Sequence, residues 1–209
     1  MRIIAGTKRG MNLFSPEGLV SRPITDRVKE SLFSVLYKYD LPAPLPSGRK
    51  AGKGAVVADL FSGVGSLGLE ALSRGAQFVV FIEQDKNIVA TLKKNIEKAG
   101  FVKDSLVIRA NAFRFDSFAT VSSVEDRNGG RKYDLVFVDP PYASSADVCP
   151  GSPLAGLLEM LGERMNKDGI VVVRTALKVS LQEQYGRLQV AERRQWGTMA
   201  VTILRKSSS

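Results

Sequence analysis

The chain has 209 residues, 44% of them hydrophobic, which suffices for one domain with a substantial core, and its formal charge of +9 and pI of about 9.8 favour a polyanionic partner. The absence of histidine excludes imidazole zinc sites and Ser-His-Asp triads, and the single cysteine, Cys149, excludes an intramolecular disulfide and argues against a thiolate metal cluster. Apolar runs are strand-sized and no secretory signal is visible, so we expect a cytoplasmic monomer without a membrane span or a bound metal.

The first 40 residues predict a small N-terminal extension. Residues 1–19 alternate short apolar pieces with glycine and basic residues, which indicates a hairpin. Residues 25–39 carry apolar side chains at helical spacing, and Thr25 or Asp26 can cap this helix. Residues 41–54, rich in Pro, Gly and Lys, then predict a linker into the main domain.

Strand and helix patterns alternate in the main domain, which we expect at residues 55–206, before a disordered tail at 207–209. The expected strands are 55–60, 77–83, 105–110, 133–139 and 169–175, and the expected helices are 67–74, 85–99 and 153–165. This order predicts a doubly wound, mostly parallel α/β sheet with helices on both faces. Residues 187–206 read as two further strands that form a hairpin on one sheet edge.

A glycine-rich turn, DLFSGVGSLG, joins the first expected strand of this domain to its helix. Gly63 and Gly65 allow close approach of a ligand to the backbone, and with Gly68 they also match a dinucleotide-binding fingerprint. Glu83, about 20 residues on, could bind ribose hydroxyls in either case. Asp59 would repel a pyrophosphate but attract the sulfonium and ammonium groups of S-adenosylmethionine, which we therefore favour over NAD.

A second motif, Asp139-Pro140-Pro141-Tyr142, follows an apolar strand, where open α/β sheets bind their ligands. The prolines fix the backbone, so that a carboxylate and a carbonyl can accept the two N–H bonds of an exocyclic base amine. Asp139 would stabilise the positive charge that the amine gains when it takes a methyl group. Tyr142 offers a face on which an extruded base can stack, worth about 1–3 kcal/mol.

Two weaker signals concern Asn111 and the basic residues near the N-terminus. Asn111 follows the third strand of the main domain and could either contact an adenine ring or cap a short helix. Basic side chains that could contact phosphates gather in the first 30 residues, namely Arg2, Lys8, Arg9, Arg22, Arg27 and Lys29. We expect a flexible hairpin carrying Lys8 and Arg9 to grip RNA, although each basic residue alone could simply lie on a solvated face.

Together these segments resemble the RsmD-type 16S rRNA (guanine-N2)-methyltransferase family over nearly the whole chain. The matching pieces are MRIIAGTKRG, RPITDRVKESLF, DLFSGVGSLGLEALSRGA, the Glu83-Gln84-Asp85 strand end, DLVFVDPPY and WGTMAVTILRK. The resemblance implies a class I, Rossmann-like methyltransferase fold with a seven-stranded sheet whose last strand is antiparallel. It also implies S-adenosylmethionine as methyl donor and a guanine of 16S rRNA, guanine 966, as acceptor, in free rRNA or in an assembling 30S subunit.

The same resemblance implies which residues would form the site. Those that would hold the cofactor are Asp59, Phe61, Ser62, Gly63, Gly65, Glu83, Gln84, Asn111, Ala112 and Asp139. The target base would be held by residues 139–142. Independently of the resemblance, the basic clustering near the N-terminus predicts that Lys8, Arg9, Arg22 and Arg27 bind RNA.

Other functions remain open on the sequence. An acidic or amide residue followed by Pro-Pro-aromatic also serves amino-methyltransferases that act on adenine or cytosine in DNA, or on a protein glutamine, although no target-recognition domain for DNA is evident. An NAD-dependent oxidoreductase and a non-catalytic RNA-binding assembly factor are the alternatives from other classes. Binding of S-adenosylmethionine against NAD, followed by an assay of methyl transfer, separates them.

Overall fold

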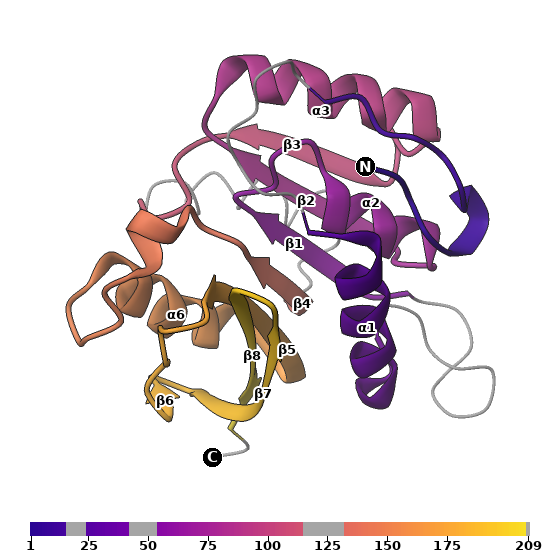
Figure 1. Ribbon diagram of the computed structural model, residues 1–209. Helices are drawn as coiled ribbons and strands as arrows, with labels where there is room; N and C mark the ends of the chain where they lie inside the picture. Colours follow the sequence, from indigo (N-terminus) through magenta and orange to yellow (C-terminus); the bar gives the residue numbers. More distant parts are fainter. Residues whose placement is uncertain (16–23, 42–53, 115–131, 208–209) are drawn as a thin grey trace.

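The computed structural model describes residues 1–15, 24–41, 54–114 and 132–207 (Figure 1). Its strands are β1 (Val56–Leu60), β2 (Phe78–Glu83), β3 (Ser105–Arg109), β4 (Tyr133–Val138), β5 (Met165–Ala176), β6 (Gln184–Tyr185), β7 (Leu188–Trp196) and β8 (Met199–Lys206). They form one sheet in the order β3-β2-β1-β4-β5-β8-β7-β6. β1 to β5 are parallel, and β8 is antiparallel to both of its neighbours, β5 and β7. The predicted α/β sheet with a C-terminal edge hairpin is confirmed.

Within the described residues the sheet has eight strands, one more than the seven expected. The additional strand, β6, has two residues and turns back onto β7 through Gly186, whose φ is 53°. Tyr185 anchors β6, since its ring is buried and its hydroxyl donates a hydrogen bond of 2.9 Å to the Val148 carbonyl. A strand of two residues carries no alternating pattern, which explains why the sequence did not reveal it.

The helices begin and end at residues that suit their termini. They are α1 (Asp26–Leu36), α2 (Ser66–Ser73), α3 (Lys86–Ala99) and α6 (Pro153–Arg164), with short 3-10 turns η1 (Gly6–Lys8), η2 (Tyr37–Tyr39) and η3 (Tyr142–Ser145). Thr25 caps α1 by accepting a hydrogen bond from Val28 N, and Asp85 caps α3 in the same way. Gly100 ends α3 in the left-handed conformation, as its position after the helix predicts. No helix among the described segments is long and apolar enough to cross a membrane.

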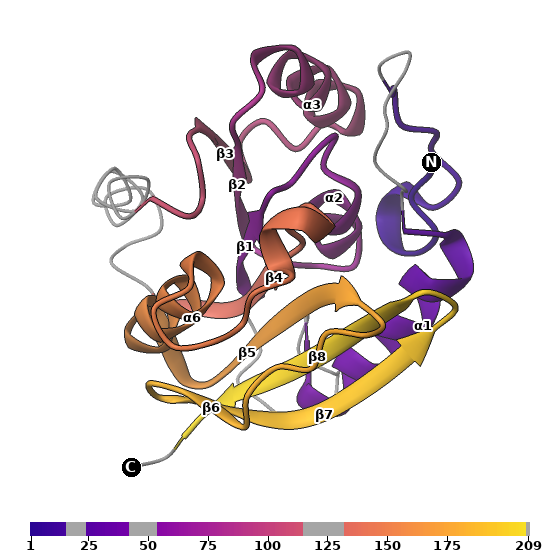
Figure 2. The same cartoon turned by 60° about the vertical axis from the view of Figure 1, so that its left-hand side comes forward.

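Helices cover both faces of the sheet, as a doubly wound fold requires (Figure 2). One core cluster joins α1, α2 and α3 to the face that carries Val57 and Phe137, and the other joins α6 to the face that carries Ala58 and Val136. The approach of α2 is close, because a Cβ atom at Gly68 would lie 2.3 Å from the Phe81 ring. The absence of a side chain at Gly68 therefore lets α2 pack directly against β2.

The N-terminal segment differs from the two-stranded hairpin that we expected. One isolated antiparallel bridge joins Arg2 and Asn12, and the chain between them contains η1. Backbone hydrogen bonds of 2.9 Å from Ile3 N to Met11 O and from Leu13 N to Met1 O flank this bridge, so the pairing resembles a hairpin but is too short to form regular strands. Most of the expected linker (41–54) and residues 208–209 of the expected tail lie outside the described residues, as do residues 16–23 and 115–131.

Candidate active site

The residues predicted to bind cofactor and base lie at the carboxyl ends of β3, β2, β1 and β4, which are neighbours in the sheet. Backbone hydrogen bonds continue to join the connecting segments beyond the strand ends: Ser62 N to Ile82 O (3.0 Å), Ala110 N to Glu83 O (3.1 Å) and Asp139 N to Leu60 O (3.4 Å). The structure therefore brings the glycine-rich turn, Glu83, Asn111 and Asp139 to one edge of the sheet.

The glycine-rich turn has a constrained backbone. Phe61 takes a left-handed conformation with φ of 62°, which costs a non-glycine residue of order 1–3 kcal/mol. Gly63 and Gly65 are also left-handed, and Gly65 N donates to Ser62 O at 2.8 Å. A Cβ atom at Gly65 would lie 2.6 Å from Leu92, whereas one at Gly63 would meet no atom within 4 Å. Gly63 thus leaves one side of the turn open to a ligand.

Asp59 is buried beneath the first turn of α2. Its exposed fraction is 2%, and its carboxylate accepts a hydrogen bond of 2.8 Å from Gly68 N. Burial raises the pKa of Asp59 well above its usual range, the Gly68 bond opposes this, and the charges of Asp139 and Glu83 raise the pKa further. A cation at this place would stabilise the ionised form of Asp59.

Glu83 ends β2 and binds backbone on both sides. One carboxylate oxygen accepts from Gly63 N at 3.0 Å, and the other accepts from Asp85 N at 2.9 Å. Glu83 thus links the glycine-rich turn to the start of α3. Gln84, beside it, is exposed.

Asn111 and Ala112 follow β3 and form a local turn. The Asn111 side-chain oxygen accepts from Phe113 N at 3.0 Å, while Ala112 is buried. The Phe113 ring lies 4.7 Å from the Phe61 ring, centroid to centroid, so it joins the turns after β3 and β1. Phe113 was not predicted as a site residue, although an aromatic residue just after a strand end was a usable signal.

The Asp139-Pro140-Pro141-Tyr142 segment leaves β4 with its first residue in an ion pair. The Asp139 carboxylate is bound by the guanidinium of Arg174, which was not predicted as a site residue. Burial raises the pKa of Asp139, and the charge of Arg174 opposes this rise. Pro140 is buried, Pro141 is exposed, and the partly exposed Tyr142 begins η3.

The site suits a ligand that carries both positive charge and hydrogen-bonding groups. Asp59, Glu83 and Asp139 come from three adjacent strands, and the charges of Glu83 and Asp139 both act on Asp59. Ser62 Oγ is buried without a hydrogen-bond partner among the described residues. S-adenosylmethionine, with its cationic sulfonium and ammonium groups, fits these residues, whereas the pyrophosphate of NAD would meet the carboxylates.

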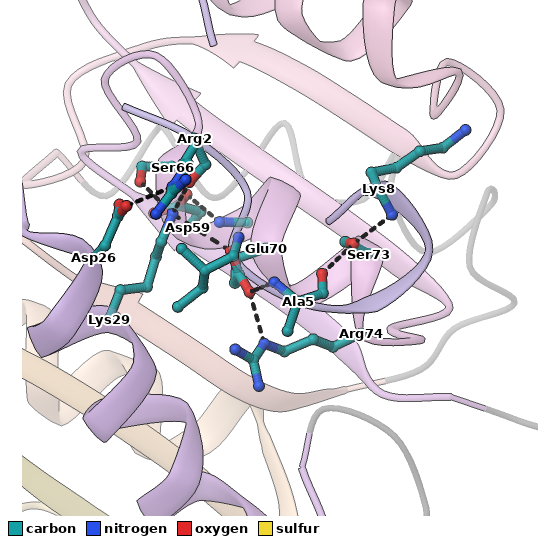
Figure 3. Close-up of polar contacts among 12 residues, drawn as sticks. Arg2, Ala5, Lys8, Asp26, Lys29, Asp59, Ser66, Glu70, Ser73 and Arg74 are labelled. Atoms are coloured by element: carbon teal, nitrogen blue, oxygen red, sulfur yellow. Dashed lines mark hydrogen bonds and ion pairs between the residues drawn. The ribbon is translucent and has the colours of Figure 1, made fainter. Parts of the chain in front are cut away.

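The N-terminal segment is docked along α2 instead of forming a free arm (Figure 3). Ile4 N and Ala5 N donate to the Glu70 carboxylate at 2.8 and 3.0 Å. Ser73, at the other end of α2, accepts from Lys8 N at 2.9 Å and donates to the Ala5 carbonyl at 2.6 Å. These bonds hold the segment against α2, so it is not the free, flexible arm that we expected.

Lys29 is a buried part of this docking and does not face solvent. Its ammonium group lies 3.4 Å from Glu70, both side chains are fully buried, and it donates to the Arg2 carbonyl and to Ser66 Oγ at 2.6 and 3.3 Å. Burial lowers the pKa of Lys29, and Glu70 opposes this shift. Lys29 therefore cannot contact a phosphate directly.

The residues predicted to bind RNA that the structure describes lie in two separate places. Lys8 and Arg9 lie beside Ser73, about 11 Å from the start of the helix at the helical rise per residue. Arg27, which is exposed, lies at the start of α1. Arg22 lies outside the described residues. The structure thus separates Lys8 and Arg9 from Asp139, which stands at the opposite edge of the sheet.

Comparisons with known proteins decide the family. Residues 1–205 match the family model described as "Conserved hypothetical protein 95". YlbH of Bacillus subtilis (strain 168), whose name describes it provisionally as an rRNA methyltransferase, is 32% identical over 208 residues, which cover 99% of each chain. The chain belongs to this family. It is the RsmD/YlbH family of S-adenosylmethionine-dependent methyltransferases, as the sequence motifs indicated.

Further members of the RsmD/YlbH family agree with this assignment. Ribosomal RNA small subunit methyltransferase D of Escherichia coli (strain K12) is 38% identical over 144 residues, which cover 68% of this chain and 60% of that protein. A solved Escherichia coli structure, yhhF, described provisionally as a methyltransferase, superposes with a TM-score of 0.72 at 27% identity, covering 100% of this chain and 99% of that one.

Proposed function

We propose that this chain transfers a methyl group from S-adenosylmethionine to the N2 amino group of a guanine in 16S rRNA, guanine 966 being the expected target. The observation that carries the proposal is the meeting of the glycine-rich turn, Glu83 and the Asp139 segment at one sheet edge. Family membership and the names of the rRNA methyltransferases among the relatives support rRNA as the substrate.

The cofactor would lie over the ends of β1, β2 and β3. Bound there, S-adenosylmethionine supplies a methyl group activated by its sulfonium charge. Glu83 would accept hydrogen bonds from its ribose hydroxyls, and Asp59 would favour its positive charge. The remaining contacts would come from residues that line the same edge, namely Phe61, Ser62, Gly63, Gly65, Gln84, Asn111, Ala112 and Asp139.

The target base would lie over the segment that follows β4. The Asp139 carboxylate and the Pro140 carbonyl would accept the two amine N–H bonds, so that the nitrogen lone pair points to the methyl group. As the nitrogen gains the methyl it becomes cationic, and Asp139 stabilises this charge and takes the released proton. Pro141 holds the turn, and Tyr142 stacks on the base.

Residues 1–40 would serve as an RNA-binding extension of the domain. The exposed side chains of Arg9 and Arg27 and the partly exposed one of Lys8 can contact phosphates, and Arg22 would add to them. Because the segment is docked on α2, it would present a fixed basic surface to the RNA.

Methyl transfer to 30S particles and to free 16S rRNA, followed by mass spectrometry of the nucleosides, tests this function. The proposal expects one new N2-methylguanosine. Label in adenosine, cytidine or a protein glutamine would show another acceptor. Tight binding of S-adenosylmethionine without transfer to either substrate would instead indicate an RNA-binding assembly factor.

A further inference from the structure

Arg174 is a charged residue within an otherwise apolar part of β5. Val173 lies opposite Val138 in the parallel pairing of β5 with β4, so the next residues, Arg174 and Asp139, are cross-strand neighbours. Their side chains form an ion pair through Arg174 Nε and Asp139 Oδ1, and they are only 13% and 18% exposed. The pair therefore lies at the catalytic edge, largely shielded from water.

Stability alone is a poor reason for such a pair. Removing two charges from water costs about as much as their attraction returns, so a shielded ion pair contributes little net stability. The sheet also carries an exposed pair of the same residue types at the other end of β5, between Arg205 and Asp168 at 2.7 Å. What distinguishes Arg174 is its partner, the carboxylate to which we assign the target amine.

We infer that Arg174 is a positioning residue that holds Asp139 Oδ1, so that Oδ2 is directed at the amine of the target base and the carboxylate keeps its charge. The inference rests on the proposed function, and it adds a residue to it. A guanidinium suits this task, because a charge-assisted Nε–H bond is strong and directional and therefore restrains the rotamer of the carboxylate.

The charge of Arg174 also sets the direction of a pH effect. Burial raises the pKa of Asp139, and Arg174 lowers it, so loss of the guanidinium must raise the pKa further. Asp139 acts as a carboxylate, so activity is lost as pH falls through its pKa. Without Arg174 that loss begins at a higher pH. Replacing a residue that only packs the sheet would not shift the pH dependence of activity.

The test compares Arg174→Gln and Arg174→Lys with Arg205→Gln, a control that removes an arginine from the exposed pair at the far end of β5. Single-turnover methyl transfer to 30S particles or 16S rRNA is measured against pH, beside the melting temperature and the dissociation constants for S-adenosylmethionine and RNA. Arg174→Gln should slow transfer by roughly 10-fold or more and move the acid limb upward, with both dissociation constants unchanged. Arg174→Lys keeps the charge and should be intermediate, and Arg205→Gln should match the wild type.

A double variant makes the inference specific to Asp139. In the Asp139→Asn background the carboxylate charge is already gone, so adding Arg174→Gln should slow transfer far less than it does alone. Equal effects in both backgrounds would overturn the inference, as would an unchanged rate and pH profile in Arg174→Gln. A weaker RNA affinity at an unchanged rate would overturn it too, because Arg174 would then bind substrate directly. A wild-type protein that binds S-adenosylmethionine but methylates no RNA would refute the proposed function itself.

Discussion

Asp59 accepts a structural hydrogen bond, but its negative charge is unfavourable because the side chain is buried. Its carboxylate holds the first turn of α2 through Gly68 N, yet burial raises its pKa well above the usual range. A cationic cofactor would relieve this cost, which explains why a buried acid can stand at the start of a ligand-binding turn.

Asp59→Asn should therefore separate stability from binding. The pKa of Asp59 is higher in the folded than in the unfolded protein, so the folded protein binds this proton more strongly. Wild-type stability therefore falls as pH rises from the unfolded pKa to the folded pKa. We expect the ligand-free variant to melt at the same or a higher temperature than the wild type at pH 8, and its relative gain to shrink towards pH 4. Calorimetry should show weaker binding of S-adenosylmethionine. Undiminished affinity would contradict the role given to Asp59.

Glu83→Ala should weaken cofactor binding in two ways, since it removes the ribose acceptor and frees Gly63 N from its partner. We expect a loss of about 1.5–3 kcal/mol in the binding free energy of S-adenosylmethionine. Exposed Glu97→Ala on α3 is the control and should bind as the wild type does. If Glu83→Ala also binds with wild-type affinity, the ribose assignment is wrong.

At the scale of single residues, the sequence identifies site residues that end strands but not those that meet their partners across strands. Asp139 and Glu83 could be predicted because the ends of parallel strands share one edge. Arg174 could not, because its partner depends on the register of β5 against β4, which shifts between Tyr133 and Leu135.

At the scale of elements, α2 connects the glycine-rich turn to the N-terminal segment. All of its residues are buried, because the sheet covers one side and the N-terminal segment lies along another. Glu70 joins these parts, since it binds the N-terminal backbone, Lys29 and Arg74. The basic pattern of the first 30 residues predicted exposure for Lys29. Its burial follows from the acid that faces it on a helix distant in sequence.

Glu70→Gln should destabilise the protein strongly, because it leaves the buried ammonium group of Lys29 without its charge partner. We expect a loss of about 3–5 kcal/mol in the free energy of unfolding, measured with denaturant. The matched control is Glu163→Gln, whose partner Arg187 is exposed, and it should cost less than about 1 kcal/mol. Similar losses in the two variants would show that the buried network does not hold the N-terminal segment.

Lys8→Ala with Arg9→Ala should weaken RNA binding to a similar extent for all sequences, if this end of the docked segment contacts phosphates. We expect the slope of the logarithm of the RNA binding constant against the logarithm of the salt concentration to become less steep by roughly 0.7–0.9 per lost contact. Affinity for S-adenosylmethionine should not change, since both residues lie beside Ser73, far from the glycine-rich turn. Exposed Lys167→Ala serves as the control. Wild-type RNA affinity in the double variant would show that Lys8 and Arg9 do not contact the RNA.

At the scale of the whole molecule, topology assembles the site from distant segments. Strands β1 to β4 place an acid, a glycine-rich turn and a Pro-Pro-Tyr segment at one edge, while β5 adds Arg174 from beyond them. Helices on both faces leave this edge as the place where a cofactor and a base can meet. In the proposed reaction, catalysis depends on one carboxylate, that of Asp139, in the segment that follows β4.

Single-turnover transfer of labelled methyl to 30S particles or 16S rRNA by Asp139 variants tests this claim most directly. Asp139→Ala removes the acceptor and should slow transfer by at least about 100-fold. The protein should stay folded and lose little cofactor affinity, since the other residues at this edge still contact the cofactor. Asp139→Asn keeps an acceptor oxygen but loses the charge, so it should be impaired yet clearly faster than Asp139→Ala. Transfer at the wild-type rate by a folded Asp139→Ala protein would contradict the account, because the segment after β4 would then be structural only.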